Sequence, residues 1–185
     1  GVVGGFGASI TAPGKAHHNG MELVRLGEMN GPISERVENL AELWRGGGFT
    51  VKCFDDMDQL VWEKLICNCA FSASAALTGW TVGEIIDDAH AWSVASNCAH
   101  EAYLVARASN IRLDIVDPVS YVRDFGAKIP DARPSMLLDH MASRVSEIDA
   151  INGAVSVEAA KVGMTAPVNE TVSQLVRGKE SAFGG

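Results

Sequence analysis

The spacing of hydrophobic positions changes along the chain. Residues 1–30 combine glycine with short runs of β-forming residues, and we expect short strands joined by turns there. Residues 37–44 carry apolar side chains at helical spacing, with Ser34 as a candidate N-cap and the glycines at 46–48 as a stop. Residues 49–53 alternate again as a strand. The first 55 residues therefore have the pattern of the end of an α/β layer.

From residue 56 onward the strand patterns vanish and helical repeats follow one another. We expect helices at about 56–77, 81–108, 117–125, 134–162 and 167–177. Gly163 and Pro167 separate the last two, as a glycine after a helix end and a proline at the next helix start do. The predicted class is mainly α: a helical domain over 56–185 preceded by an α/β segment over 1–55.

Composition limits the function classes. The chain has 185 residues with 15 Lys+Arg against 23 Asp+Glu, a net charge of −8, and no cluster of cations, which argues against nucleic-acid binding. No apolar run approaches the ~18 residues that a membrane span needs, so no membrane partner is expected. The chain has four unevenly spaced cysteines, Cys53, Cys67, Cys69 and Cys98, which do not have the pattern of a disulfide framework. This favours a protein of the reducing cytoplasm.

Two tempting motifs are weak. Gly4-Gly5-Phe6-Gly7 has glycines like a dinucleotide-binding loop, but no helix pattern follows it, and such a loop needs a strand before and a helix after. Cys67 and Cys69 lie two apart on a predicted helix and point away from each other, and the five histidines are scattered, so no metal site is expected. Residue 1 is Gly within a strand pattern, and we expect the chain to begin inside a longer protein.

The predicted helix at 56–77 has polar groups on an apolar stripe. Lys64 and Asn68 are i, i+4 neighbours and share a face that Ser72 extends. A lysine among leucine and valine side chains is expected to be partly desolvated, which lowers an ammonium pKa and eases proton donation. The alternative is that Lys64 extends its head to water along the stripe and Asn68 bonds nearby backbone.

These residues carry a resemblance to a known family. The stretch Trp62-Glu63-Lys64-Leu65-Ile66-Cys67-Asn68, followed by Ala76-Leu77-Thr78-Gly79 and Gly83-Glu84, resembles the ketopantoate reductases (2-dehydropantoate 2-reductases). The likeness continues through Pro134–Asp139, Glu147–Asp149, Ile151–Gly153 and 163–167. It implies a 6-phosphogluconate-dehydrogenase C-terminal-like helical domain after the last strands and helix of a Rossmann-type NADP-binding domain.

The resemblance also implies a reaction. Family members reduce a 2-keto acid, ketopantoate, to pantoate with NADPH, in pantothenate biosynthesis. Lys64 matches the proton donor, Asn68 and Ser135 match substrate-binding residues, and Glu147 matches a glutamate at the cofactor end of the cleft. We expect Ser72 to line the substrate site together with Asn68 and Ser135. The phosphate-binding fingerprint of the family is not in these residues, so the chain alone is expected to be inactive and to bind NADPH weakly.

Structural roles compete with two of these assignments. Ser135 follows Pro134 at a predicted helix start, where a serine often caps the helix. Glu147 lies three residues after Arg144, and a solvated ion pair is an alternative for it.

The chain departs from the family at two positions. Ser72 stands where a second asparagine is usual, and Val82 stands where another precedes the Gly83-Glu84 pair. A site that loses polar partners for a substrate hydroxyl selects less well for that hydroxyl, so another 2-keto acid is an alternative substrate. A non-catalytic helical module for assembly or ligand binding is the alternative of a different class. A homodimer is also expected, with the apolar helix at 92–106 as a candidate surface.

Overall fold

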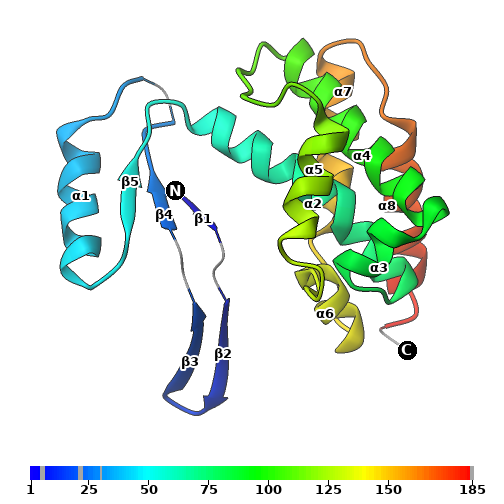
Figure 1. The fold of residues 1–185 in the computed structure, drawn as a ribbon, viewed down its shortest axis with the longest axis horizontal. Coiled ribbons are helices and arrows are strands. Elements are labelled where there is room, and N and C mark those ends of the chain that lie inside the picture. Colours follow the sequence, from blue (N-terminus) through cyan, green and yellow to red (C-terminus); the bar gives the residue numbers. More distant parts are fainter. Residues whose placement is uncertain (5–6, 21–22, 30, 184–185) are drawn as a thin grey trace. The chain divides into compact units, whose positions relative to one another are not determined.

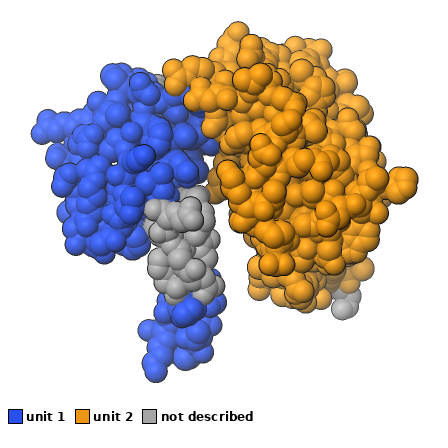
Figure 2. All heavy atoms as spheres, viewed as in Figure 1, with its two compact units in different colours: residues 1–61 blue, residues 62–185 orange. Residues whose placement is uncertain are grey.

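The computed structural model describes residues 1–4, 7–20, 23–29 and 31–183, and it consists of two compact units. Unit 1 comprises Gly1–Val61 and unit 2 comprises Trp62–Gly185 (Figure 2). Unit 1 is an α/β layer, and unit 2 is built from helices alone in the part that is described (Figure 1). The predicted fold class, a helical domain that follows the last strands and helix of a Rossmann-type domain, is confirmed.

Unit 1 contains a small mixed sheet and a β-hairpin. Its elements are listed in chain order: β1 (Val2–Gly4), β2 (Gly7–Ala12), β3 (Lys15–Gly20), β4 (Leu23–Leu26), α1 (Glu35–Gly46) and β5 (Val51–Cys53). The sheet order is β1-β4-β5, with β1 antiparallel to β4 and β5 parallel to β4. The parallel pair is joined through α1, which is the crossover unit of Rossmann-type sheets. Apolar residues from the sheet and from α1 form the core of unit 1: Val24, Leu26, Val37, Ala41 and Val51.

Local signals explain where α1 begins and ends. Ser34 has an extended backbone, and its hydroxyl accepts a hydrogen bond from the amide of Val37 at 3.3 Å. The helix ends at Gly46, and Gly48 follows with φ +89°, a conformation that glycine adopts without a steric penalty. Both boundaries agree with the predicted cap and stop.

Unit 2 is organised around α2, which is buried on all sides over part of its length. Its elements are α2 (Met57–Thr78, which starts before the unit boundary), α3 (Val82–Asp87), α4 (Ala89–Ala108), α5 (Pro118–Ala127), α6 (Ser135–Met141), the 3₁₀-helix η1 (Ile148–Ala150), α7 (Asn152–Lys161) and α8 (Pro167–Glu180). Every residue of 69–76 is buried. α2 is long and apolar enough to span a membrane, but 56% of its apolar window is buried inside the protein, as in the core helix of a globular domain.

Small side chains are frequent at the buried positions of α2 and α4. α2 contributes fully buried alanines at 70, 73, 75 and 76, and α4 contributes them at 95, 99, 102 and 106. α4 packs against α5, α7 and α8, and α7 lies beside α8 (Figure 1).

Four helices meet at two buried asparagines. The side-chain amide of Asn152 donates to the carbonyl of Cys69 at 3.0 Å and to Oδ1 of Asn169 at 2.9 Å. Asn169 Nδ2 donates to the carbonyl of Cys98 at 3.0 Å and to Glu101 Oε2 at 2.8 Å. The two asparagines are fully buried and join α2, α4, α7 and α8. This network fixes α2 within the unit.

The Glu101 carboxylate also caps α8. It accepts hydrogen bonds from the amides of Val168 and Asn169, each at 2.9 Å. The N-cap position of α8 is Ala166, which has no side-chain hydrogen bond to offer. A carboxylate from α4 therefore supplies the anionic cap that the local sequence lacks.

Two predicted helices are each divided. The helix predicted at 81–108 breaks at Asp88, whose backbone is extended and whose Oδ1 accepts from the amides of His90 and Ala91, so it ends α3 and starts α4. The helix predicted at 134–162 is α6, η1 and α7, with an irregular segment over 142–147. Ser143 has φ +52° and Ile151 has φ −108° and ψ −98°, neither of which continues a helix.

Candidate functional site

Three of the predicted site residues form a stripe along α2. Lys64, Asn68 and Ser72 are spaced four apart, so their side chains lie on one side of the helix at ~6 Å intervals. Lys64 is exposed, Asn68 is half-buried and Ser72 is buried, with 4% of its surface exposed. The α2 stripe, as we call these three residues, therefore runs from the surface into the core of unit 2.

The expected partial desolvation of Lys64 is wrong. Lys64 is exposed, and Val61 beside it is 44% exposed. The continuous buried face of α2 begins only at Ile66, one turn further into the domain. The ammonium group can still donate a hydrogen bond or a proton to a bound oxyanion.

The two positions where the chain departs from the family that it resembles are both buried. Val82 begins α3 and is 2% exposed, within the core of unit 2. A Cβ added at Gly126 would lie 2.9 Å from a Val82 methyl group, which shows how closely α5 approaches it. Val82 therefore contributes packing and offers no side-chain hydrogen bond.

Ser135 is the first residue of α6 and is exposed. The residue before the helix is Pro134, and no side chain caps α6, so the capping role considered for Ser135 is wrong. Its hydroxyl can both donate and accept, which suits a carboxylate ligand.

Glu147 is exposed and precedes η1. The ion pair considered for it is wrong, because Arg144 binds a different carboxylate. Arg144 Nε and Nη2 donate to Asp139 Oδ1 at 3.1 and 2.8 Å. Ser135 and Glu147 therefore lie at the two ends of one segment, 135–147, which comprises α6 and the irregular residues after it.

A buried ionisable cluster next to this segment was missed by sequence reasoning. Glu180 of α8 lies beside His140 of α6 and beside Ser146, and its Oε1 is 3.0 Å from His140 Nε2. Burial alone would raise the pKa of Glu180, but hydrogen bonds from Ser146 and His140 outweigh it and hold this pKa below its ordinary value. The partners are 34 and 40 residues away along the chain, so no local spacing could have revealed them.

The cysteines are free thiols, and three of them are buried: Cys67, Cys69 and Cys98. Burial raises the pKa of Cys67 to about 12, with the Glu63 carboxylate adding to the shift. Burial likewise raises the pKa of Cys98 to about 12, and here the nearby carboxylate is Glu101. A thiol that stays protonated is neither a nucleophile nor a metal ligand, so these cysteines act in packing.

Unit 2 has a pocket of about 420 Å³ that contains none of the predicted site residues. Its lining comes from α2, α4 and α8: Ser74, Leu77, Thr78, Ala91, Val94, Pro167, Val168, Thr171, Val172 and Leu175. No charged side chain lines it. A 2-keto acid carries a carboxylate, and this pocket would remove water from that carboxylate without offering it a cation. The pocket therefore does not suit a 2-keto acid.

The described residues do not form a cradle for cofactor phosphates. Of Gly4-Gly5-Phe6-Gly7, residues 5 and 6 lie outside the described part, and the next element after β1 is the strand β2, not a helix. The N-terminus of α1 has Glu35 and Glu38 in its first turn, which would repel a phosphate. Within residues 1–4, 7–20, 23–29 and 31–183, no group of three His, Cys, Asp or Glu side chains could hold a metal ion.

Comparison with known proteins identifies the family. Residues 56–180 match the family model described as "Ketopantoate reductase PanE/ApbA C terminal". The chain belongs to the ketopantoate reductase family. The 2-dehydropantoate 2-reductase of Archaeoglobus fulgidus is 31% identical over 185 residues, which is 98% of this chain and 62% of that protein. The one from Pyrobaculum aerophilum is 33% identical over 160 residues, or 86% of this chain and 56% of that protein.

Solved ketopantoate reductases have the same fold. The PanE/ApbA family ketopantoate reductase from Ralstonia eutropha aligns with a TM-score of 0.88 at 27% identity, covering 100% of this chain and 59% of that one. The 2-dehydropantoate 2-reductase from Geobacter metallireducens gives a TM-score of 0.84 at 26% identity, with 95% and 58% covered. The chain thus spans about three fifths of the length of the relatives it matches.

Proposed function

We propose that this chain supplies the substrate-binding and proton-donating part of an NADPH-dependent reductase of 2-keto acids, with ketopantoate as the substrate and pantoate as the product. The α2 stripe carries this proposal, because it places a cation, an amide and a hydroxyl on one side of a single helix. Family membership supports the reaction class. The reaction is a step of pantothenate biosynthesis and takes place in the cytoplasm.

The proposed division of labour follows the two structural units. Residues 1–55 form the end of a Rossmann-type NADP-binding domain, and residues 56–185 form the helical domain that binds substrate. This division is close to the boundary of the compact units after Val61 and to the start of the family match at residue 56.

In the proposed reaction, reduced nicotinamide supplies a hydride to the carbonyl carbon of the 2-keto acid. The carbonyl oxygen gains negative charge as the C=O π bond breaks, and Lys64 Nζ gives it a proton, which leaves a neutral lysine and a 2-hydroxy acid. Asn68 donates to the substrate, and Ser72 continues the polar side of α2. Ser135 holds the substrate carboxylate, and Glu147 lies on the cofactor side.

A different 2-keto acid is the second candidate substrate, and Ser72 and Val82 favour it. Ser72 is buried and shorter than the usual asparagine, and Val82 is buried in the core with no polar side-chain atom. A substrate hydroxyl therefore finds fewer partners here than in the family. We expect a weakened preference for ketopantoate over the same 2-keto acid without its hydroxyl group.

The test uses the complete gene product that contains these residues, with NADPH oxidation measured on both 2-keto acids. Oxidation that depends on a 2-keto acid supports the proposed reaction. No oxidation with any 2-keto acid would overturn it in favour of a non-catalytic helical module. A strong preference for ketopantoate would remove the second substrate and leave the first.

The 185 residues alone are expected to bind NADPH weakly, since the described residues offer its phosphates no glycine-rich turn at a helix N-terminus. Titration followed by nicotinamide fluorescence measures this affinity. A micromolar dissociation constant would contradict the assignment of the phosphate site to other residues. Sedimentation of the same sample tests the proposed homodimer.

A further inference from the structure

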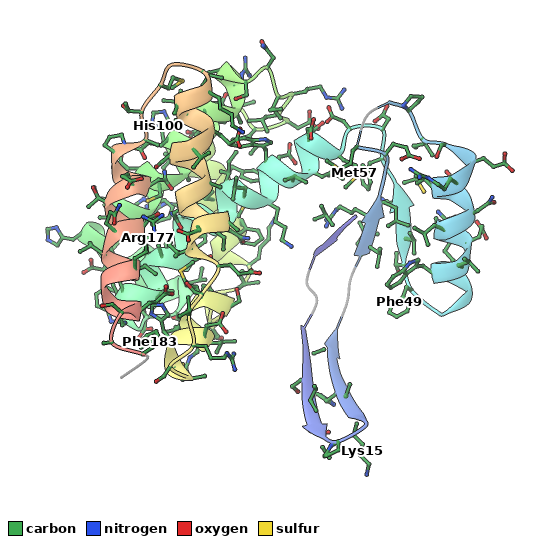
Figure 3. The ribbon with its side chains drawn as sticks, turned by 180° about the vertical axis from the view of Figure 1, so that it is seen from behind. Lys15, Phe49, Met57, His100, Arg177 and Phe183 are labelled. Atoms are coloured by element: carbon green, nitrogen blue, oxygen red, sulfur yellow. The ribbon has the colours of Figure 1, made fainter. Side chains whose placement is uncertain are left out.

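One buried carboxylate oxygen binds two parts of the segment that carries Ser135 and Glu147. Glu180 is the last residue of α8, and its side chain is 6% exposed. Its Oε1 accepts hydrogen bonds from the Ser146 amide at 2.8 Å, from the Ser146 hydroxyl at 2.5 Å and from His140 Nε2 at 3.0 Å. We call Glu180, His140 and Ser146 the Glu180 cluster. Figure 3 labels Arg177 on α8, one turn before Glu180, and Phe183 just after it.

The cluster has the chemistry of a buried anion with dedicated donors. The lowered pKa of Glu180 keeps its carboxylate ionised at neutral pH, so it can only accept hydrogen bonds. His140 Nε2 must then carry the hydrogen that joins the two residues. The His140 ring also meets Phe183 edge-on, with the ring centroids 5.0 Å apart, which closes this side of the cluster. Burying a carboxylate without hydrogen-bond donors costs free energy. Removing either the donors or Glu180 therefore disturbs the remaining residues of the Glu180 cluster.

Glu180 holds the end of this segment, whereas its start is fixed by α6. The amides of Ala142 and Ser143 donate to α6 carbonyls, and Arg144 binds Asp139 through its amide and its guanidinium group. Residues 142–145 are all exposed, so no buried side chain anchors this part of the segment. Ser143 has φ +52°, a conformation that is uncommon for a residue other than glycine. Ser146 is the point where the segment returns to the core, and Glu147 is its immediate neighbour. Ile148 on the other side of Glu147 is buried in the core, so the position of Glu147 depends on the hydrogen bonds of Ser146 together with the packing of Ile148.

A second and weaker contact comes from the same helix. Arg177 Nε and Nη2 donate to Asp149 Oδ1 at 2.8 and 2.7 Å, two residues after Glu147. This pair is at the surface, with Asp149 78% exposed, and exposed pairs contribute little to stability. Glu180 is the buried contact of the two, and it also reaches α6 through His140.

We propose that Glu180 is a positioning residue of the reductase: through Ser146 and His140 it holds Glu147 and the helix of Ser135 in their working geometry. This inference rests on the proposed function, in which Ser135 binds substrate and Glu147 lies on the cofactor side. Glu180 itself touches neither ligand. A displacement of about 1 Å at such contacts lowers catalytic efficiency by up to roughly a hundredfold.

The test compares Glu180→Met with Glu180→Gln in the complete gene product. Methionine keeps the length of the side chain and has no oxygen acceptor, whereas glutamine keeps one carbonyl oxygen for Ser146. Gln174→Met is the matched control, because Gln174 is an exposed residue of the same helix. Two quantities are measured: the KM values for NADPH and the 2-keto acid, and the hydrogen exchange of the amides at 142–147.

We expect Glu180→Met to raise both KM values by roughly tenfold and to speed exchange at Ser146, while Glu180→Gln recovers most of both. The control is expected to match the unsubstituted protein. If Glu180 only stabilised the fold, Glu180→Met would lower the folded fraction and the apparent kcat with KM unchanged, and that result would overturn the inference. Should Glu180→Met fail to fold, Ser146→Ala takes its place, because it removes the hydroxyl donor to Glu180, and unchanged KM values with unchanged exchange in Ser146→Ala would overturn the inference equally. An unsubstituted protein without reductase activity would instead refute the proposed function itself.

Discussion

The most demanding structural prediction concerns Asn169, which links α4 and α7 to α8. Asn169→Leu keeps the branching and the number of side-chain heavy atoms and removes three hydrogen bonds, to Asn152, to the Cys98 carbonyl and to Glu101. Two of these bonds are between neutral groups at about 1 kcal/mol each, and the bond to a carboxylate contributes about 2 kcal/mol. Apolar burial of leucine returns about 1 kcal/mol, so the free energy of unfolding should fall by roughly 3 kcal/mol.

Urea unfolding measures this loss. Tryptophan fluorescence in a Trp44→Phe background reports on unit 2, because Trp44 is the tryptophan of unit 1. Gln174→Leu is the matched control: Gln174 is an exposed amide of the same helix, and its replacement should change the free energy of unfolding by less than about 0.5 kcal/mol. A loss below about 1 kcal/mol in Asn169→Leu would refute the idea that the buried amide network holds the four helices together.

Three further outcomes follow from the structure. Gly126→Ala places a Cβ 2.6 Å from an Ile86 methyl group and should lower the free energy of unfolding by about 1–3 kcal/mol. Gly178→Ala, whose Cβ meets open space, should raise the free energy of unfolding by about 0.5–1 kcal/mol. Urea titrations of the two variants measure both changes. The folded pKa of Glu180 lies below its ordinary 4.5, so its stabilisation is complete above that value and is lost as the pH falls through the folded pKa. The stability difference between the unsubstituted protein and Glu180→Gln should therefore shrink as the pH falls below 4.5. Native alkylation followed by mass spectrometry should modify Cys53, which is partly exposed, before the three buried thiols, and prior modification of a buried thiol would contradict the packing.

Elements with strong local signals could be predicted from the sequence. α1 has a serine cap at its start and glycines at its end, and α8 begins at a proline. These two helices could therefore be predicted with boundaries within a few residues. The break at Asp88 was missed because apolar residues at helical spacing continue across it, and only the extended backbone of that residue separates α3 from α4.

Features that depend on distant contacts could not be read from spacing. Residues 142–147 contain no glycine or proline, and their irregular path is held by Glu180 from another helix. Arg144 was paired with Glu147 by spacing, but the turn after α6 brings Asp139 to it. Lys64 shares a helix face with apolar residues, and whether that face is covered depends on the tertiary packing, which here leaves the lysine exposed.

The central claim is that Lys64 protonates the substrate oxygen in a 2-keto acid reductase. The most direct measurement is the steady-state rate of NADPH oxidation by the complete gene product and its Lys64→Ala variant, with Lys161→Ala as the control because Lys161 is an exposed lysine paired with Glu158. Lys64→Ala should lower kcat by roughly a hundredfold or more, and the control should leave it unchanged. A kcat that is the same in Lys64→Ala and in the unsubstituted enzyme would contradict the account.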